Sequence, residues 1–318
     1  MLTIGKVTVR GANWLLLITL ALQLVIGACI GLGIKWYTHT VGYSFAEQPK
    51  LYSTIILVEV FAVLIPTLIY LARKKVNVRE TLRLNPIAWR TSFMIVILAL
   101  SGQFVALLIS IPMNIFLSLF GQLPPASVPI PNTLEECLIG ALIIGFFPAI
   151  CEEILSRGVL LRAYELRGTK AAIVISGLFF GIMHMNLQSI AATTFLGMFL
   201  AYIVIKTNSI YAAMLAHFVN NFFSMFWGYF AKGYTDQMTT EFGLVILGIM
   251  LASVFIFMVT FVIFRSHLPP IALIPSISSR AKHMKAAFVN TPVMITVVLY
   301  VLMAGVLMAE IMKILPVK

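Results

Sequence analysis

Cys151-Glu-Glu-Ile-Leu-Ser-Arg157 closes an apolar run that begins near Leu134. Two adjacent carboxylates and an arginine therefore stand in a segment that is predicted to be a membrane helix. At that depth an ionisable group costs about 2.5–3.5 kcal/mol on insertion scales. Glu153 lies four residues before Arg157, so the two can pair on one helix face, whereas Glu152 is rotated from its neighbour by roughly 100°. The stretch predicts one glutamate held by arginine beside one glutamate left for chemistry.

The rest of the chain is also unusually apolar. Of its 318 residues, 61% are hydrophobic and 10% are charged, and the mean hydropathy is +1.02. A soluble domain of this size does not need so much apolar sequence, and the composition indicates a polytopic helical membrane protein. We therefore expect an all-α integral membrane bundle with eight or nine transmembrane helices. The candidate spans fall at about 13–34, 51–72, 91–120, 134–162, 170–186, 187–206, 209–230, 242–264 and 292–314.

The basic residues give the expected topology. The net charge is +11, but Lys and Arg crowd the ends of the apolar runs instead of forming a nucleic-acid footprint, so no nucleic-acid partner is expected. The positive-inside rule places the N-terminus in the cytoplasm of a multi-pass protein of the cell membrane. We divide the chain into N-terminal spans with a cytoplasmic basic loop (1–133), a catalytic membrane core (134–230) and C-terminal spans (231–318). The basic segment 73–90 is expected to lie partly along the inner interface.

Three polar clusters interrupt the spans of the predicted core. The first is Glu152, Glu153 and Arg157, the second is Phe180-Gly-Ile-Met-His184, and the third is His217-Phe-Val-Asn-Asn221. A turn at Gly168 would stand equally far from Glu152 and His184, which places the two at one height in an antiparallel hairpin.

Polar side chains of these types at one depth in the bundle predict a reaction centre. A glutamate can act as general base to a water that one histidine helps to hold. The other histidine and the asparagine can donate hydrogen bonds to a developing oxyanion. Gly177 and Gly181, on the face of His184, predict that a neighbouring helix approaches closely.

The three motifs, in this order, resemble those of the CAAX protease and bacteriocin-processing family. That family includes the type II CAAX prenyl endopeptidases and the bacterial Abi-type self-immunity proteins. The resemblance implies an all-helical intramembrane endopeptidase that acts, within the lipid bilayer, on a membrane-associated peptide or protein, either prenylated or a bacteriocin or signal peptide. It implies that Glu152 and His184 activate water and that His217 and Asn221 form the oxyanion hole. Glu153 and Arg157 are then supporting residues.

The resemblance leaves the metal requirement open, because members of the family have been called both metalloproteases and glutamate proteases. We expect catalysis without a cofactor, since pairing of Glu153 with Arg157 would compete with a cation for one of few ligands. The alternative is a Zn²⁺-dependent version of the same protease. Its ligands would be Glu152, Glu153, His184 and His217.

Two other function classes compete with the protease. Buried Glu, His and Arg can form the relay of a proton-coupled transporter, although the chain shows neither inverted repeats nor paired broken helices. A non-catalytic bacteriocin-immunity or scaffold membrane protein is the third class. Glu59, in the second span, is interpreted as a contact within the bundle and is left out of the site. Cys151 has no nearby basic helper on its own helix and is not expected to be a nucleophile.

Overall fold

The computed structural model describes residues 6–42, 47–124, 130–232, 240–269, 271, 274 and 279–313, and within these residues the regular structure is helical, with no strand. The α-helices are α1 (Val9–Val41), α2 (Glu47–Leu57), α3 (Ile65–Arg73), α4 (Val78–Thr81), α5 (Trp89–Ser118), α6 (Leu134–Leu155), α7 (Leu161–Glu165), α8 (Thr169–Met183), α9 (Ile190–Thr207), α10 (Ile210–Lys232), α11 (Thr240–His267), α12 (Arg280–Phe288) and α13 (Thr291–Ile311). The expected polytopic helical bundle is confirmed.

Each predicted span is helical over most of its described length, although residues 184–189, at the boundary between two of the spans, lie outside the helices. In that part of the chain, seven helices are long and apolar enough to cross a membrane: Val9–Val41, Lys50–Arg73, Trp89–Ser118, Leu134–Glu165, Ile190–Thr207, Gly243–His267 and Thr291–Ile311. The other two predicted spans are α8 and α10. α8 has 15 residues, about 22 Å at 1.5 Å per residue, which is less than the ~30 Å of a hydrocarbon core. α10 has 23 residues, but His217, Asn220 and Asn221 lower its hydropathy.

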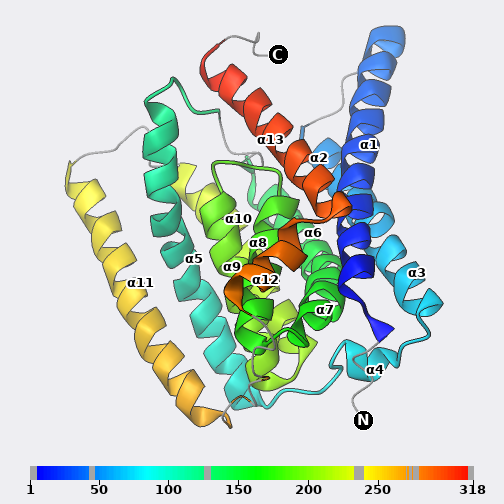
Figure 1. The fold of residues 1–318 in the computed structure, drawn as a ribbon. Helices are drawn as coiled ribbons and strands as arrows, with labels where there is room; N and C mark the ends of the chain where they lie inside the picture. Colours follow the sequence, from blue (N-terminus) through cyan, green and yellow to red (C-terminus); the bar gives the residue numbers. More distant parts are fainter. Residues whose placement is uncertain are drawn as a thin grey trace.

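The helices of the predicted core occupy the middle of the bundle. Figure 1 shows α6, α8, α9 and α10 at the centre, with α11 at one edge beside α5. Half of the most apolar window of Leu134–Glu165 is buried, against 11% of that of Gly243–His267. The apolar side chains of α11 therefore face outward, where lipid would contact them, whereas the helix that carries the two glutamates is packed on several sides.

Glycines allow α8 and α9 to pack closely. A Cβ atom added at Gly177 would lie 2.8 Å from the backbone nitrogen of Met198 and 3.0 Å from the carbonyl oxygen of Thr194. A Cβ atom added at Gly197 would lie 2.9 Å from the Cα atom of Gly177. The close approach predicted from Gly177 and Gly181 is confirmed, and the partner is α9. Small residues at such a crossing let two backbones approach without a side chain between them.

Two described segments are π-helical instead of α-helical. Val58–Leu64 joins α2 to α3 and carries Glu59, and Ser156–Leu160 joins α6 to α7 and carries Arg157. π-helical turns are rare in proteins and frequently occur at functional sites. Here each turn lies within a continuous helix and carries an ionisable side chain that is buried in the bundle.

Candidate active site

Glu153 is the centre of a buried charge cluster. Its side chain has no exposed surface, and its Oε1 accepts a hydrogen bond of 2.9 Å from Nη1 of Arg157. The same oxygen lies 2.9 Å from Nδ1 of His217, which comes from α10. The predicted pair of Glu153 with Arg157 is therefore confirmed. The second partner, His217, was not predicted, because the sequence shows its depth but not the direction in which its ring points.

Arg157 connects three helices. It is 1% exposed, and its Nη2 donates to the carbonyl oxygen of Gly197 on α9 at 3.0 Å. Its guanidinium also lies over the ring of Phe180 on α8, with 4.5 Å from Cζ to the ring centroid. A buried cation is tolerated when it is paired and hydrogen-bonded. Arg157 thus balances the charge of Glu153 and attaches α6 to both neighbours.

Phe180 brings the second and third motifs together. Its ring centroid lies 4.8 Å from that of His184 and 5.7 Å from that of His217. The first residue of the Phe-x-x-x-His motif therefore contacts both histidines as well as the guanidinium of Arg157. One aromatic ring fixes the spacing between side chains that come from α6, α8 and α10.

His184 lies at the end of α8 with one ring nitrogen occupied. Its Nδ1 is 2.8 Å from the carbonyl oxygen of Phe180. A carbonyl only accepts hydrogen bonds, so Nδ1 carries a proton and, in the neutral ring, Nε2 is an acceptor. The residue is exposed at the helix terminus, and Met185 follows it with φ of 47°. His184 can therefore accept a hydrogen bond from a water at Nε2.

His217 is also held through Nδ1, but unlike His184 it is buried. It is 2% exposed, and its Nδ1–H donates to the Glu153 carboxylate. In the neutral ring Nε2 then has a lone pair and no proton. His217 can donate from Nε2 only as an imidazolium. A role in stabilising an oxyanion thus requires the charged form of this histidine.

Asn221 lies one turn beyond His217 on α10. Its Nδ2 donates to the carbonyl oxygen of Ile144 on α6 at 3.2 Å, and its Oδ1 accepts from Nδ2 of Asn220 at 3.1 Å. α6 and α10 meet closely here, because a Cβ atom added at Gly145 would lie 3.0 Å from the ring of Phe218. The amide of Asn221 is held in place and keeps one N–H for another acceptor.

Glu152 has a different neighbour. The side chain of Glu59, in the π-helical segment Val58–Leu64, forms a hydrogen bond with that of Glu152. A hydrogen bond between two carboxyl groups requires a proton on one of them. Glu59 is 6% exposed, and the Oε2 atoms of both residues have no hydrogen-bond partner among the described residues. The interpretation of Glu59 as a bundle contact is therefore incomplete, since the group it contacts is the predicted base. The sequence feature that could have pointed to a functional role for Glu59 is its position in an apolar span.

The four predicted zinc ligands are not arranged as a metal site. In the described part of the chain, no three or more His, Cys, Asp or Glu side chains are grouped so that they could hold a metal ion. Oε1 of Glu153 already accepts from Arg157 and His217. Structural and catalytic zinc sites use three or four converging ligands. Among the described residues, Glu152, Glu153, His184 and His217 therefore do not form such a group.

Comparison with known proteins agrees with the motifs. Residues 134–223 match the family model described as Type II CAAX prenyl endopeptidase Rce1-like. All three motifs lie within this segment. Neither the curated proteins nor the solved structures include a match to the chain.

Proposed function

We propose that this chain, which belongs to the CAAX protease and bacteriocin-processing family through residues 134–223, is an intramembrane endopeptidase that uses a glutamate-activated water. The observation that carries the proposal is the buried contact of His217 with Glu153 and Arg157, next in sequence to an unpaired Glu152 oxygen. It supplies an oriented imidazole and a carboxylate within the segment that matches a protease family.

Glu152 is the general base in this proposal. It takes a proton from a water as the water oxygen bonds to the carbonyl carbon of the substrate peptide. Nε2 of His184 accepts the second hydrogen of that water and orients it, because Nδ1 is held by the carbonyl of Phe180. When the C–N bond breaks, the proton on Glu152 passes to the leaving amine. A positioned base of this kind contributes about 10²–10⁴-fold to the rate.

His217 and Asn221 stabilise the oxyanion. The imidazolium of His217 donates from Nε2, and Asn221 donates the N–H that Ile144 does not use. Glu153 and Arg157 are positioning residues: the carboxylate fixes the His217 ring, and the guanidinium holds that carboxylate in place. Donors that are already oriented stabilise the transition state without reorganisation.

The test is turnover of a membrane-tethered peptide by purified protein. Glu152→Gln is expected to keep the fold and to lose at least the ~10²–10⁴-fold contributed by a general base. Glu135→Gln, at the exposed start of the same helix, is the matched control and is expected to retain activity. Equal turnover by the two variants would contradict the assignment of the base. Absence of turnover in the wild-type protein would instead favour a non-catalytic immunity or scaffold protein.

The metal requirement is tested on the same preparation. We expect chelator-treated protein to retain full turnover, with no stoichiometric metal in the active material. Loss of activity in chelator and its recovery with zinc would overturn the metal-free mechanism. It would also turn Glu152, His184 and His217 from base, helper and oxyanion donor into ligands.

The substrate we propose is a peptide or protein that is itself held at the membrane. The site is enclosed by apolar helices, so a substrate that already partitions into the bilayer reaches it at a higher local concentration. Matched peptides with and without a prenyl group, tested on the same enzyme, separate a lipidated substrate from a bacteriocin or signal peptide. A soluble peptide cleaved as efficiently as either membrane-tethered form would contradict this substrate class.

A further inference from the structure

A second site lies at one end of the helical bundle. This end is formed by α4 and by the turns that precede α8 and α10. It is a cavity of about 990 Å³. Among the described residues that line it, four are cationic and two are acidic: Arg79, Arg83, Arg162 and Lys206 against Glu80 and Glu165. Apolar side chains complete the wall, including Pro86, Ile87, Ile205 and Leu268. The cavity thus combines excess positive charge with a hydrophobic lining.

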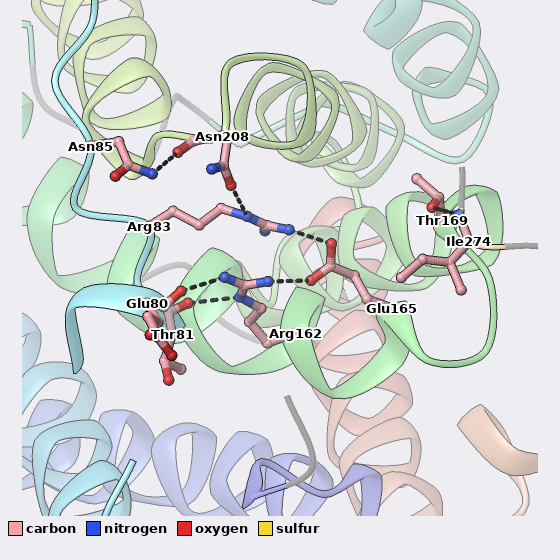
Figure 2. Close-up of polar contacts among 9 residues, drawn as sticks. All are labelled: Glu80, Thr81, Arg83, Asn85, Arg162, Glu165, Thr169, Asn208 and Ile274. Atoms are coloured by element: carbon pink, nitrogen blue, oxygen red, sulfur yellow. Dashed lines mark hydrogen bonds and ion pairs between the residues drawn. The ribbon is translucent and has the colours of Figure 1, made fainter. Parts of the chain in front are cut away.

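One carboxylate lies between two of these arginines. Figure 2 shows Arg83 bonded to one oxygen of Glu165 and Arg162 bonded to the other, the latter at 3.2 Å. Arg162 is also engaged at its remaining donors, with Nε bonded to the carbonyl of Thr81 at 2.8 Å and Nη2 bonded to that of Glu80. Two guanidinium groups therefore share a single buried carboxylate, and the other carboxylate of the lining, Glu80, is exposed and also acts on Arg162.

Arg83 is the group with unused bonding capacity. Its side chain is 8% exposed, and its Nε donates to Oδ1 of Asn208 at 3.0 Å. Its Nη1 has no hydrogen-bond partner within the residues that the structure describes. A buried guanidinium nitrogen without an acceptor costs free energy. An anionic oxygen that reached Nη1 would relieve that cost.

Lys206 adds a further charge. It is 9% exposed, and its Nζ donates to the carbonyl oxygens of Leu268 and Pro269 at 2.9 and 2.7 Å. These acceptors are neutral, so the lysine satisfies its donors without cancelling its charge. Three largely buried cations thus face one buried carboxylate. Buried charge of one sign is normally balanced, and the missing counter-charge is negative.

We propose that this cavity binds the phosphate group of an anionic phospholipid. The cations match the phosphate, and the apolar wall matches the glycerol and upper acyl chain. The neighbouring segment carries the features of a membrane interface: Trp89 is 75% exposed and Arg90 lies over its ring at 5.5 Å. Aromatic and basic side chains concentrate at that level of a bilayer, and basic pockets between spans bind anionic lipid headgroups. A soluble phosphate shares the charge but does not use the apolar wall.

Occupancy would act on the helix that carries the proposed base. Arg162 and Glu165 lie on the continuous helical segment Leu134–Glu165, which also carries Glu152. An anion that neutralises Arg83 and Lys206 would therefore stabilise the end of this segment against α4 and α9. The inference stands apart from the protease proposal, because lipid binding can be measured without any substrate.

The experiment measures the affinity of the full chain for phosphatidylglycerol by native mass spectrometry from nanodiscs, with phosphatidylcholine as the comparison lipid. Each Lys or Arg near an anionic surface contributes about fivefold in affinity. Lys206→Gln is expected to weaken phosphatidylglycerol retention about fivefold, and its combination with Arg83→Gln about thirtyfold. Arg90→Gln also removes one positive charge, from a position in the basic segment 73–90 that lies outside the cavity. This variant is expected to retain the lipid at wild-type affinity.

The variants and the added phosphate distinguish a specific lipid site from general surface attraction and from a site for a soluble anion. Lys206→Gln leaves every carboxylate with its partner, so it keeps the test valid if the double variant does not fold. Equal loss of lipid in Arg90→Gln and Lys206→Gln would overturn the proposal in favour of general surface attraction. Thermal stabilisation by inorganic phosphate in phosphatidylcholine nanodiscs, equal to that by phosphatidylglycerol, would overturn the lipid assignment and identify a soluble anion.

Discussion

Replacement of Arg157 tests the charge cluster most directly. Arg157→Met keeps the apolar length of the side chain but removes the guanidinium that bonds to Glu153 and to the Gly197 carbonyl and lies over Phe180. Breaking a buried pair typically costs about 3–5 kcal/mol. The freed carbonyl and the lost ring contact each add about 1–2 kcal/mol. His217 still donates to Glu153, which offsets part of the loss, and we expect a net cost near ~4–5 kcal/mol.

That cost is large against the roughly 5–15 kcal/mol that stabilises a typical protein. We therefore expect Arg157→Met to lower the yield of folded protein and the free energy of unfolding measured in mixed detergent. Combining it with Glu153→Gln should restore part of the yield, because neither partner then remains charged and buried alone. Arg90→Met, at an exposed arginine, is the control and should unfold like the wild type. Full expression of Arg157→Met with an unchanged unfolding free energy would refute the reasoning.

The remaining predictions concern catalysis and topology. Asn221→Ala should lower turnover by about 10²–10³-fold, the loss typical of one oxyanion donor, and a larger loss than in Glu152→Gln would contradict its role. Glu59→Leu should lower turnover by about 10- to 150-fold, the loss expected for one hydrogen bond to a charged group. Glu59→Gln keeps a hydrogen-bond donor and should lower turnover less. Equal losses in the two variants would show that the hydrogen bond between Glu59 and Glu152 is not needed. With the N-terminus inside, single cysteines at Arg79 and Lys313 should label from opposite sides of the membrane, and labelling of both from outside would disprove the topology.

The apolar runs predicted the helices well because a bilayer leaves few alternatives. Backbone groups in hydrocarbon must be satisfied within their own helix, so each run became a helix at nearly the expected residues. The pair of Glu153 with Arg157 was predictable for a similar reason, since a four-residue spacing places both side chains on one face. Such relations are local and follow from helix geometry alone.

Contacts between distant helices were not predictable in the same way. Depth counting placed His217 near the level of the glutamates, but its bond to Glu153 depends on how α10 is rotated about its axis. The contact of Glu59 with Glu152 depends on the packing of the second span against α6. The sequence also did not indicate the π-helical turns, which change the direction of the side chains that follow them.

The π-helical turn Ser156–Leu160 has a consequence for how the longest helix of the core tolerates change. Such a turn holds one residue more than an α-helical turn, and one residue corresponds to about 100° of rotation. Glu153 before the turn faces His217, and Glu165 after it faces Arg83. Deletion of a single residue within the turn would leave a continuous apolar helix. It would nevertheless put the two carboxylates out of phase, so that when one meets its partner the other points into a neighbouring helix or into lipid.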